Sequence, residues 1–196
     1  KISYATYVKD RIDGFSGESD RKAPQDLDDF PSFKERIARS GGTPTYTRPC
    51  CTHELKIKDT LSLTKDINNF KSALEDNNHK QAFMNAASPG VISAFLPNKF
   101  YKDDDDYLNA LSNIMTTEYE EIVSNDINLQ LDCPDLALAR HMTFKDLSEV
   151  EFLKRAEKQI EFLNHSIKNI PSSKIRMHIC WGNYEGPHSH DISLEK

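Results

Sequence analysis

His178 and Cys180 are the two residues whose types and spacing point most directly to chemistry. They lie in residues 174–180, which we predict to form a short buried strand. Residues two apart on a strand point to the same face, so the imidazole and the thiol would project together. Zinc takes nitrogen and sulfur ligands, usually four in all, and a catalytic zinc keeps one position open. The pair therefore predicts half of a zinc site, with a buried cysteine beside a hydrogen-bonded histidine as the structural alternative.

Four further polar residues follow predicted strands, namely Arg48, Asn85, Ser88 and Asp132. In αβ barrels and open α/β sheets, the site lies at the carboxyl ends of the strands. We therefore predict that these four residues bind substrate. Three of them have a structural alternative: Asp132 could cap the next turn, Arg48 could pair with a structural carboxylate, and Asn85 could satisfy backbone groups.

The remaining cysteines and two late histidines are weaker candidates. Cys50, Cys51 and Cys133 are expected to be small buried residues rather than ligands. His188 and His190 follow a Gly-Pro turn, so a role in metal binding competes with simple exposure at the surface.

The elements that must position these residues alternate between strand and helix. Ser148 with Glu151 predicts a capping box, and the aspartates of residues 103–106 are expected to open a helix. Because no hairpin signal separates the strands, we predict parallel strands joined by helical crossovers. Helices are predicted at 3–12, 32–39, 60–74, 104–123 and 148–169, strands at 45–49, 82–86, 129–132 and 174–180, and irregular structure over most of 14–42.

Composition argues against several classes of protein. The 196-residue chain has a formal net charge of −6 and no cluster of Lys or Arg, which argues against nucleic acid or an anionic membrane as partner. No stretch approaches the roughly 18 apolar residues of a membrane span, and no signal peptide opens the sequence. Four cysteines, two of them adjacent, do not make a disulfide framework, so we expect reduced thiols in the cytoplasm. Neither a phosphate loop nor a Gly-x-Ser-x-Gly elbow is present.

Residues 176–188, Arg-Met-His-Ile-Cys-Trp-Gly-Asn-Tyr-Glu-Gly-Pro-His, resemble the zinc-strand motif of the cobalamin-independent methionine synthase family. The similarity is greatest to its short single-barrel branch, methionine synthase II, and epoxyalkane:coenzyme M transferase is a relative with a similar motif. Further segments agree in the family's order and extend the resemblance over nearly the whole chain, at residues 7–15, 41–52, 85–91 and 129–137.

This resemblance implies a (β/α)8 TIM barrel of the methionine synthase/uroporphyrinogen decarboxylase-like type, in which Zn²⁺ binds and activates a thiol. His178 and Cys180 match its first two zinc ligands, while the remaining Glu and Cys ligands are expected on later strands, beyond Lys196. Asp132 matches the Asp of an Asp-Glu-Pro-Ala motif that contacts the amino group of homocysteine. Cys133 replaces the Glu of that motif, which leaves the amino-acid substrate open.

The resemblance leads us to expect a single domain over residues 1–196, the central part of a TIM barrel with about four parallel strands. The first and last strands of the barrel would be missing. The expected activity is zinc-dependent methyl or alkyl transfer to a small-molecule thiol, with a methyl-folate as one candidate donor. Epoxide addition of the coenzyme M type, a truncated non-catalytic fragment that self-associates as a homo-oligomer, and a metal-free decarboxylase-like barrel stay open as alternatives.

Overall fold

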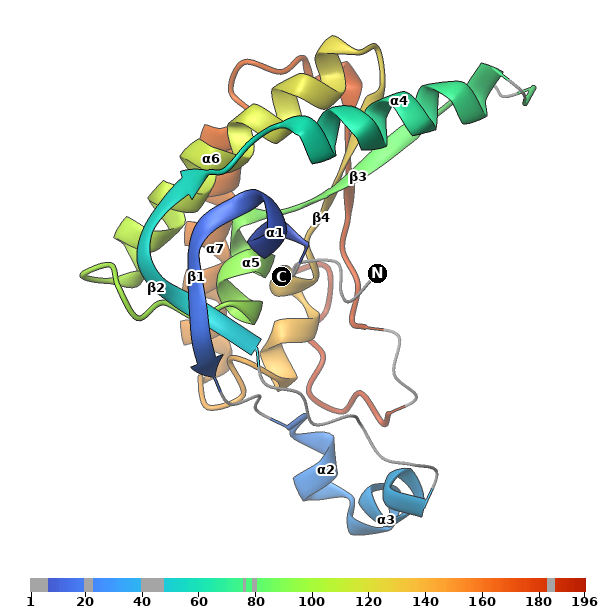
Figure 1. Ribbon diagram of the computed structural model, residues 1–196. Helices are drawn as coiled ribbons and strands as arrows, with labels where there is room; N and C mark the ends of the chain where they lie inside the picture. The colour runs from blue at the N-terminus through green and yellow to red at the C-terminus, as the bar shows by residue number, and fades with distance from the viewer. Residues whose placement is uncertain (1–6, 20–22, 40–47, 76, 79–80, 183–185) are drawn as a thin grey trace.

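Two separate sheets organise the part of the chain that the structure describes (Figure 1). The structure is a computed structural model and describes residues 7–19, 23–39, 48–75, 77–78, 81–182 and 186–196. In the first sheet, β1 (Ile12–Ser19) pairs antiparallel with β2 (Arg48–Ile57). The second sheet is parallel, in the order β3 (Phe83–Ala87), β4 (Asn128–Asp132) and β5 (Ile175–His178). The chain is therefore a mixed α/β protein with a three-stranded parallel sheet.

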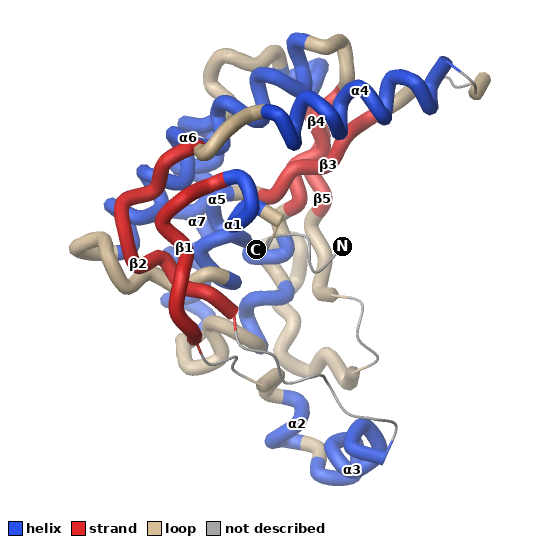
Figure 2. The backbone as a smooth tube through the Cα atoms, in the orientation of Figure 1, coloured by secondary structure: helices blue, strands red, loops and turns tan. Residues whose placement is uncertain are grey.

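Helices connect the strands and cover the sheets (Figure 2). Helix α6 packs against β3 and β4, and both α5 and α7 pack against α6. In the part of the chain that is described, no helix combines the length and the hydropathy of a membrane span. The helices are α1 (Val8–Arg11), α2 (Asp26–Asp29), α3 (Pro31–Arg39), α4 (Leu61–Glu75), α5 (Pro89–Phe95), α6 (Asp104–Ser124) and α7 (Glu149–Ser166), with 3-10 turns η1 (Pro134–Leu136), η2 (Leu138–His141) and η3 (Ser172–Lys174).

Periodicity and capping signals predicted most of the long elements correctly. Helices α3, α4, α6 and α7 and strands β3 and β4 lie within a few residues of their predicted bounds. The capping box is confirmed, because the Ser148 hydroxyl accepts the Glu151 N–H and the Glu151 carboxylate accepts the Ser148 N–H. The Asp103 carboxylate likewise accepts the Asp106 N–H at the start of α6. Of the helix predicted at 3–12, residues 3–6 lie outside the described residues and α1 forms its second half.

The prediction of irregular structure after residue 14 is wrong, because β1 and α2 lie there. The pairing of β1 with β2 shifts register between Asp13 and Phe15. Gly14 sits at this irregularity with φ +109°, and a Cβ there would lie 2.8 Å from the Leu55 side chain and 2.9 Å from the His53 carbonyl oxygen. Such a bulge interrupts the alternation of side chains, which removes the sequence signal of a strand.

The prediction of four parallel strands is also wrong, because the described residues contain three parallel strands. Arg48 and Pro49 open β2, which runs antiparallel to β1, while residues 45–47 lie outside the described residues. Helix α5 was not predicted, and Ser88, predicted above only as a substrate-binding residue after a strand, caps its start. Its Ser88 hydroxyl accepts the Val91 N–H, and Pro89 takes the first helical position, where its missing N–H costs nothing.

Strand β5 differs from the buried strand predicted at 174–180. It ends at His178, so Cys180 lies beyond it, and Arg176, Met177 and His178 are exposed. The physical reason is the position of β5 at the edge of the parallel sheet, where the described residues provide a neighbouring strand on the β4 side only.

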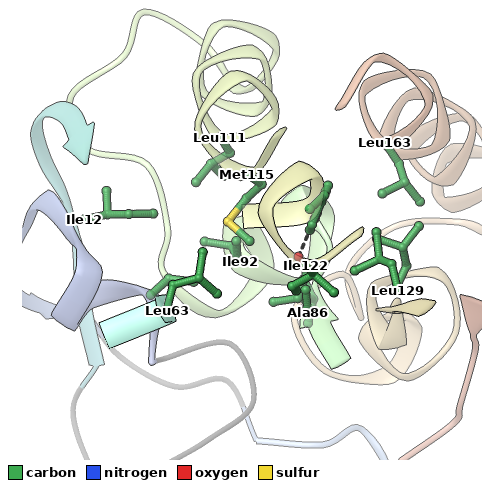
Figure 3. Packing of buried hydrophobic residues seen from close by; sticks show 14 of the residues in the cluster. Ile12, Leu63, Ala86, Ile92, Leu111, Met115, Ile122, Leu129 and Leu163 are labelled. Atoms are coloured by element: carbon green, nitrogen blue, oxygen red, sulfur yellow. Dashed lines mark hydrogen bonds between the residues drawn. The ribbon is translucent and has the colours of Figure 1, made fainter. Parts of the chain in front are cut away.

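The hydrophobic core lies between the parallel sheet and the helices (Figure 3). Leu129 and Leu131 alternate along β4 with Gln130 and Asp132, so the two leucines share the face that packs under α6. The core residues around them that Figure 3 labels are Ala86, Ile92, Leu111, Met115, Ile122 and Leu163. The opposite face of the sheet is consequently the polar one.

A buried polar network joins α1 to α4 and α6. The carboxylate of Glu118 accepts hydrogen bonds from the Tyr7 hydroxyl and, at 3.1 Å, from Nη1 of Arg11. Nη2 of Arg11 donates to Asp66 of α4 at 2.5 Å. Burial raises the pKa of Glu118, while the hydrogen bond from Tyr7 and the charge of Arg11 act in the opposite direction.

We expect Glu118→Ala to lower the free energy of unfolding by about 3 kcal/mol, because it leaves the buried Arg11 charge with only the partly exposed Asp66 as its carboxylate and removes the acceptor of the Tyr7 hydroxyl. Urea titration followed by circular dichroism measures the change. Glu157→Ala, at an exposed position of α7, is the matched control and should stay within about 0.5 kcal/mol of the parent. A loss below about 1 kcal/mol for Glu118→Ala would contradict the structural role of the network.

Candidate functional site

The polar face of the parallel sheet collects side chains from all three strands. In the register, Asn85 of β3 lies beside Gln130 of β4 and Arg176 of β5. Two residues further along these strands, Asp132 of β4 lies beside His178 of β5. Residues in register on parallel strands point to the same side, so these five side chains share one face. They lie opposite the leucine face that packs under α6.

Asp132 and His178 form the close pair at the carboxyl ends of β4 and β5. Oδ1 of Asp132 lies 3.8 Å from Nε2 of His178. Asp132 is buried, whereas nearly half of the His178 side chain is exposed, at 48%. Burial raises the pKa of Asp132, and the neighbouring His178 lowers it. The pair therefore offers an accessible imidazole backed by a largely buried carboxyl group.

Cys180 lies two residues beyond β5 and is electrostatically coupled to the same carboxylate. Its carbonyl oxygen accepts the Leu138 N–H at 3.2 Å, which fixes the segment against η2. Burial raises the pKa of the Cys180 thiol, the Gly182 N–H lowers it, and Asp132 raises it. The thiol is therefore protonated at neutral pH unless a cation replaces its proton.

The imidazole of His178 and the thiol of Cys180 match the donor types that zinc prefers. Together with Asp132 they nevertheless do not bring three ligand atoms within 4.8 Å of one another in the described part of the chain. The groups that do so there are His141, His188 and Asp191 on the one hand and Asp26, Asp29 and His190 on the other.

The other predicted substrate-binding residues have different surroundings. Oδ1 of Asn85 is buried and has no hydrogen-bond partner among the described residues, so it is an acceptor facing the polar side of the sheet. Ser88 is buried and donates to Asp135 at 2.7 Å while capping α5. Arg48 lies in the antiparallel sheet, with its guanidinium 4.1 Å from the centre of the Phe95 ring. The structure thus brings Asn85, Asp132 and His178 onto one sheet and puts Arg48 in the other.

The expectation that Cys50, Cys51 and Cys133 are small buried residues is confirmed. All three are free thiols with at most 1% of their surface exposed. Burial raises the pKa of Cys51 to about 11 and raises that of Cys133 further above its ordinary value. Neutral thiols of this kind pack as apolar groups.

Asp135 is a buried carboxyl group that was not among the predicted site residues. It is 2% exposed and accepts the Ser88 hydroxyl, and its burial raises the pKa to about 7. Gly90 of α5 allows the close approach, because a Cβ there would lie 2.1 Å from Oδ2 of Asp135 and 3.2 Å from the Gln159 side chain. Asp135 lies three positions after Asp132, so the two carboxyl groups flank the same turn after β4.

Comparisons with known proteins support the fold. No protein-family model matches the sequence, and no curated protein matches it. Among solved structures, the chain is similar to a B12-independent methionine synthase from Shewanella sp. W3-18-1 in complex with selenomethionine, with a TM-score of 0.63 and 13% sequence identity. The match covers 91% of this chain and 43% of that one. At this identity the similarity shows a shared fold, and the chain spans less than half the length of that enzyme.

The buried Asp135 gives a testable dependence of stability on pH. The folded chain holds the proton with a pKa of about 7, well above the ordinary value of 3.8, so folding favours the protonated form. The free energy of unfolding should therefore fall as the pH rises from about 4 to about 7. Between about pH 5 and about pH 7 we expect this carboxyl group to contribute a loss of about 2 kcal/mol.

Asp135→Asn should remove this part of the pH dependence, because the amide stays neutral throughout. Urea midpoints measured at several pH values compare the variant with the parent. Asp10→Asn, which alters a carboxylate 70% exposed, is the control and should keep the parent's slope. Parallel pH curves for the parent and Asp135→Asn would show that Asp135 is ionised throughout.

Proposed function

We propose that this chain forms the central part of a (β/α)8 barrel that transfers a methyl or alkyl group to a thiol held by zinc. One observation carries the proposal: Asp132, His178 and Cys180 gather where two adjacent parallel strands end. This is the edge at which barrel enzymes build their sites. The similarity of fold to a B12-independent methionine synthase supports the same conclusion.

In this proposal His178 and Cys180 hold the zinc, with further ligands supplied from outside the described residues. When bound, the ion keeps the substrate thiol as a thiolate, the form that attacks an electrophilic carbon. Asp132, whose Oδ1 lies 3.8 Å from Nε2 of His178, accepts a hydrogen bond from the ammonium group of an amino-thiol. The unsatisfied Oδ1 of Asn85 accepts a second substrate donor.

Charge on the polar face favours an amino-acid thiol such as homocysteine over a sulfonate thiol such as coenzyme M. A carboxylate attracts an ammonium group and repels a sulfonate. On this face, the carboxylate of Asp132 lies within ion-pair distance of His178. Arg176, whose guanidinium lies 4.1 Å from the centre of the Phe83 ring, shares the face and is a partner for the substrate carboxylate. A methyl-folate is the proposed donor in the cytoplasm. Arg48 and Ser88 remain predictions for binding it.

A non-catalytic role for the chain alone is the second candidate. The exposed edge strand β5 and the incomplete ligand set around His178 favour it, because both are features that a longer polypeptide or a second copy would complete. The following two experiments separate this reading from an active thiol transferase.

Cobalt is the probe for the proposed metal pair, because a cysteine ligand gives thiolate-to-cobalt charge-transfer absorption. We expect this absorption in the parent and its loss in Cys180→Ser and His178→Ala. Cys50→Ser, which changes a buried thiol of β2, is the matched control and should leave the absorption unchanged. If the parent shows no thiolate absorption, His178 and Cys180 do not form a metal site in this chain.

Asp132→Asn should weaken homocysteine binding to the zinc-loaded protein by at least about tenfold, because it removes a charged acceptor, while zinc content stays unchanged. Isothermal titration of homocysteine and of 2-mercaptoethanesulfonate provides the comparison. Tighter binding of the sulfonate by the parent would favour the coenzyme M type of reaction. If neither thiol binds to the zinc-loaded protein, the non-catalytic role is favoured.

A further inference from the structure

A second group of metal-ligating side chains lies away from His178 and Cys180, where the C-terminal segment 186–196 meets η2. His141 of η2 is fully buried. Its Nδ1 lies 3.5 Å from Oδ1 of Asp191, whose Oδ2 lies 3.1 Å from Nδ1 of His188. The rings of His141 and His188 meet edge to face, with centroids 5.5 Å apart. One carboxylate therefore bridges two imidazoles from distant parts of the sequence.

Hydrogen bonds around the group fix the backbone of His141 and His188. Asp26, also fully buried, accepts the His188 N–H at 3.2 Å and the Ser189 hydroxyl at 3.1 Å. The His141 carbonyl oxygen accepts the Gln25 N–H at 2.8 Å. His188 itself adopts φ +55°, a left-handed conformation that is uncommon for a residue with a side chain. Such a conformation persists where surrounding contacts fix it, and it occurs preferentially at ligand sites.

The spacing of the three residues fits a common ion. With metal–ligand bonds of about 2.0–2.2 Å and bond angles between about 90° and about 109°, two ligands of one ion lie roughly 2.8–3.6 Å apart. The 3.5 Å from His141 Nδ1 to Oδ1 of Asp191 and the 3.1 Å from His188 Nδ1 to Oδ2 of Asp191 each fall inside this range, to different oxygens of one carboxylate. With one ligand atom taken from each residue, the three atoms lie within 4.8 Å of one another. We propose that His141, His188 and Asp191 form a zinc site, separate from His178 and Cys180, that ties the C-terminal segment to η2.

The donor set fits zinc and leaves room for a water ligand. Two imidazole nitrogens and one carboxylate oxygen are a known three-ligand combination for zinc, and neutral imidazoles are the form that binds. The neighbouring group of Asp26, Asp29 and His190 adds carboxylates, and His190 bonds directly to Asp29. The His141 group offers two imidazole nitrogens where this neighbouring group offers one, and two imidazoles with one carboxylate are a known zinc ligand set, which favours the His141 group.

Cobalt titration of the 196-residue chain in the Cys180→Ser background tests the assignment, because that background removes the thiolate site. We expect one cobalt ion per chain with visible ligand-field absorption and no thiolate charge transfer. His188→Gln and Asp191→Asn should each weaken cobalt binding by at least about tenfold, since each removes a proposed ligand, and both side chains are partly exposed, at 26% and 24%. His165→Gln, at an exposed histidine of α7 bonded to Asn113, should bind as tightly as the background.

Amide hydrogen exchange provides an independent readout. Zinc should slow exchange in residues 186–191 of the Cys180→Ser protein and leave it unchanged in its Asp191→Asn derivative. The proposal is overturned if the Cys180→Ser protein binds no cobalt, or if His188→Gln and Asp191→Asn bind it as tightly as the background. Loss of binding in His190→Gln together with full binding in His188→Gln would also overturn it, in favour of the group around Asp29.

Discussion

The buried contact between Glu118 and Arg11 is the constraint on which the arrangement of this chain depends. It fixes α1, and with it the antiparallel sheet, against α6, the helix that also covers β3 and β4. The same cluster reaches the end of β3, where the Tyr119 hydroxyl donates to the Ala87 carbonyl at 2.5 Å. Charges that are costly to bury thus define how the two sheets are positioned, a role that interchangeable apolar contacts fill less specifically.

Division of the parallel sheet into an apolar and a polar face links this architecture to chemistry. Helix α6 covers the leucines of β4, so the alternate residues must face the other way. Burial on that face raises the pKa of Asp132 above its ordinary value, while the neighbouring His178 lowers it. Asp132 and His178 are the last residues of β4 and β5 and are partners in the strand register. The register therefore brings the carboxyl group of Asp132 beside His178.

Local sequence signals predicted the parts of the fold that local physics determines. Helical periodicity located α4, α6 and α7, and hydrophobic runs located β3 and β4. Strand β1 was not predicted because a bulge at Gly14 breaks the alternation of its apolar and polar side chains. Helix α5 was not predicted because Ser88 and the proline after it are as typical of a turn as of a helix start.

The site residues also fall into those that local sequence signals predicted and those that depend on contacts between distant segments. Asp132 and His178 were predicted from their positions at strand ends, and the register brings them together. The burial of Asp135 and the meeting of His141 with Asp191 depend on contacts between segments far apart in the chain. No periodicity, motif or spacing in a single sequence encodes such contacts, so only the folded arrangement reveals them.

Gly90 has a consequence for how this sequence can vary. A glycine inside a helix ordinarily costs about 1 kcal/mol relative to alanine, so replacing it is a standard route to a more stable protein. Here even a methyl group would overlap the Asp135 carboxyl group, and the turn after β4 would have to move with it. Replacing Gly90 with alanine should therefore not stabilise the short helix α5. Position 90 should tolerate fewer residue types than helix propensity scales suggest.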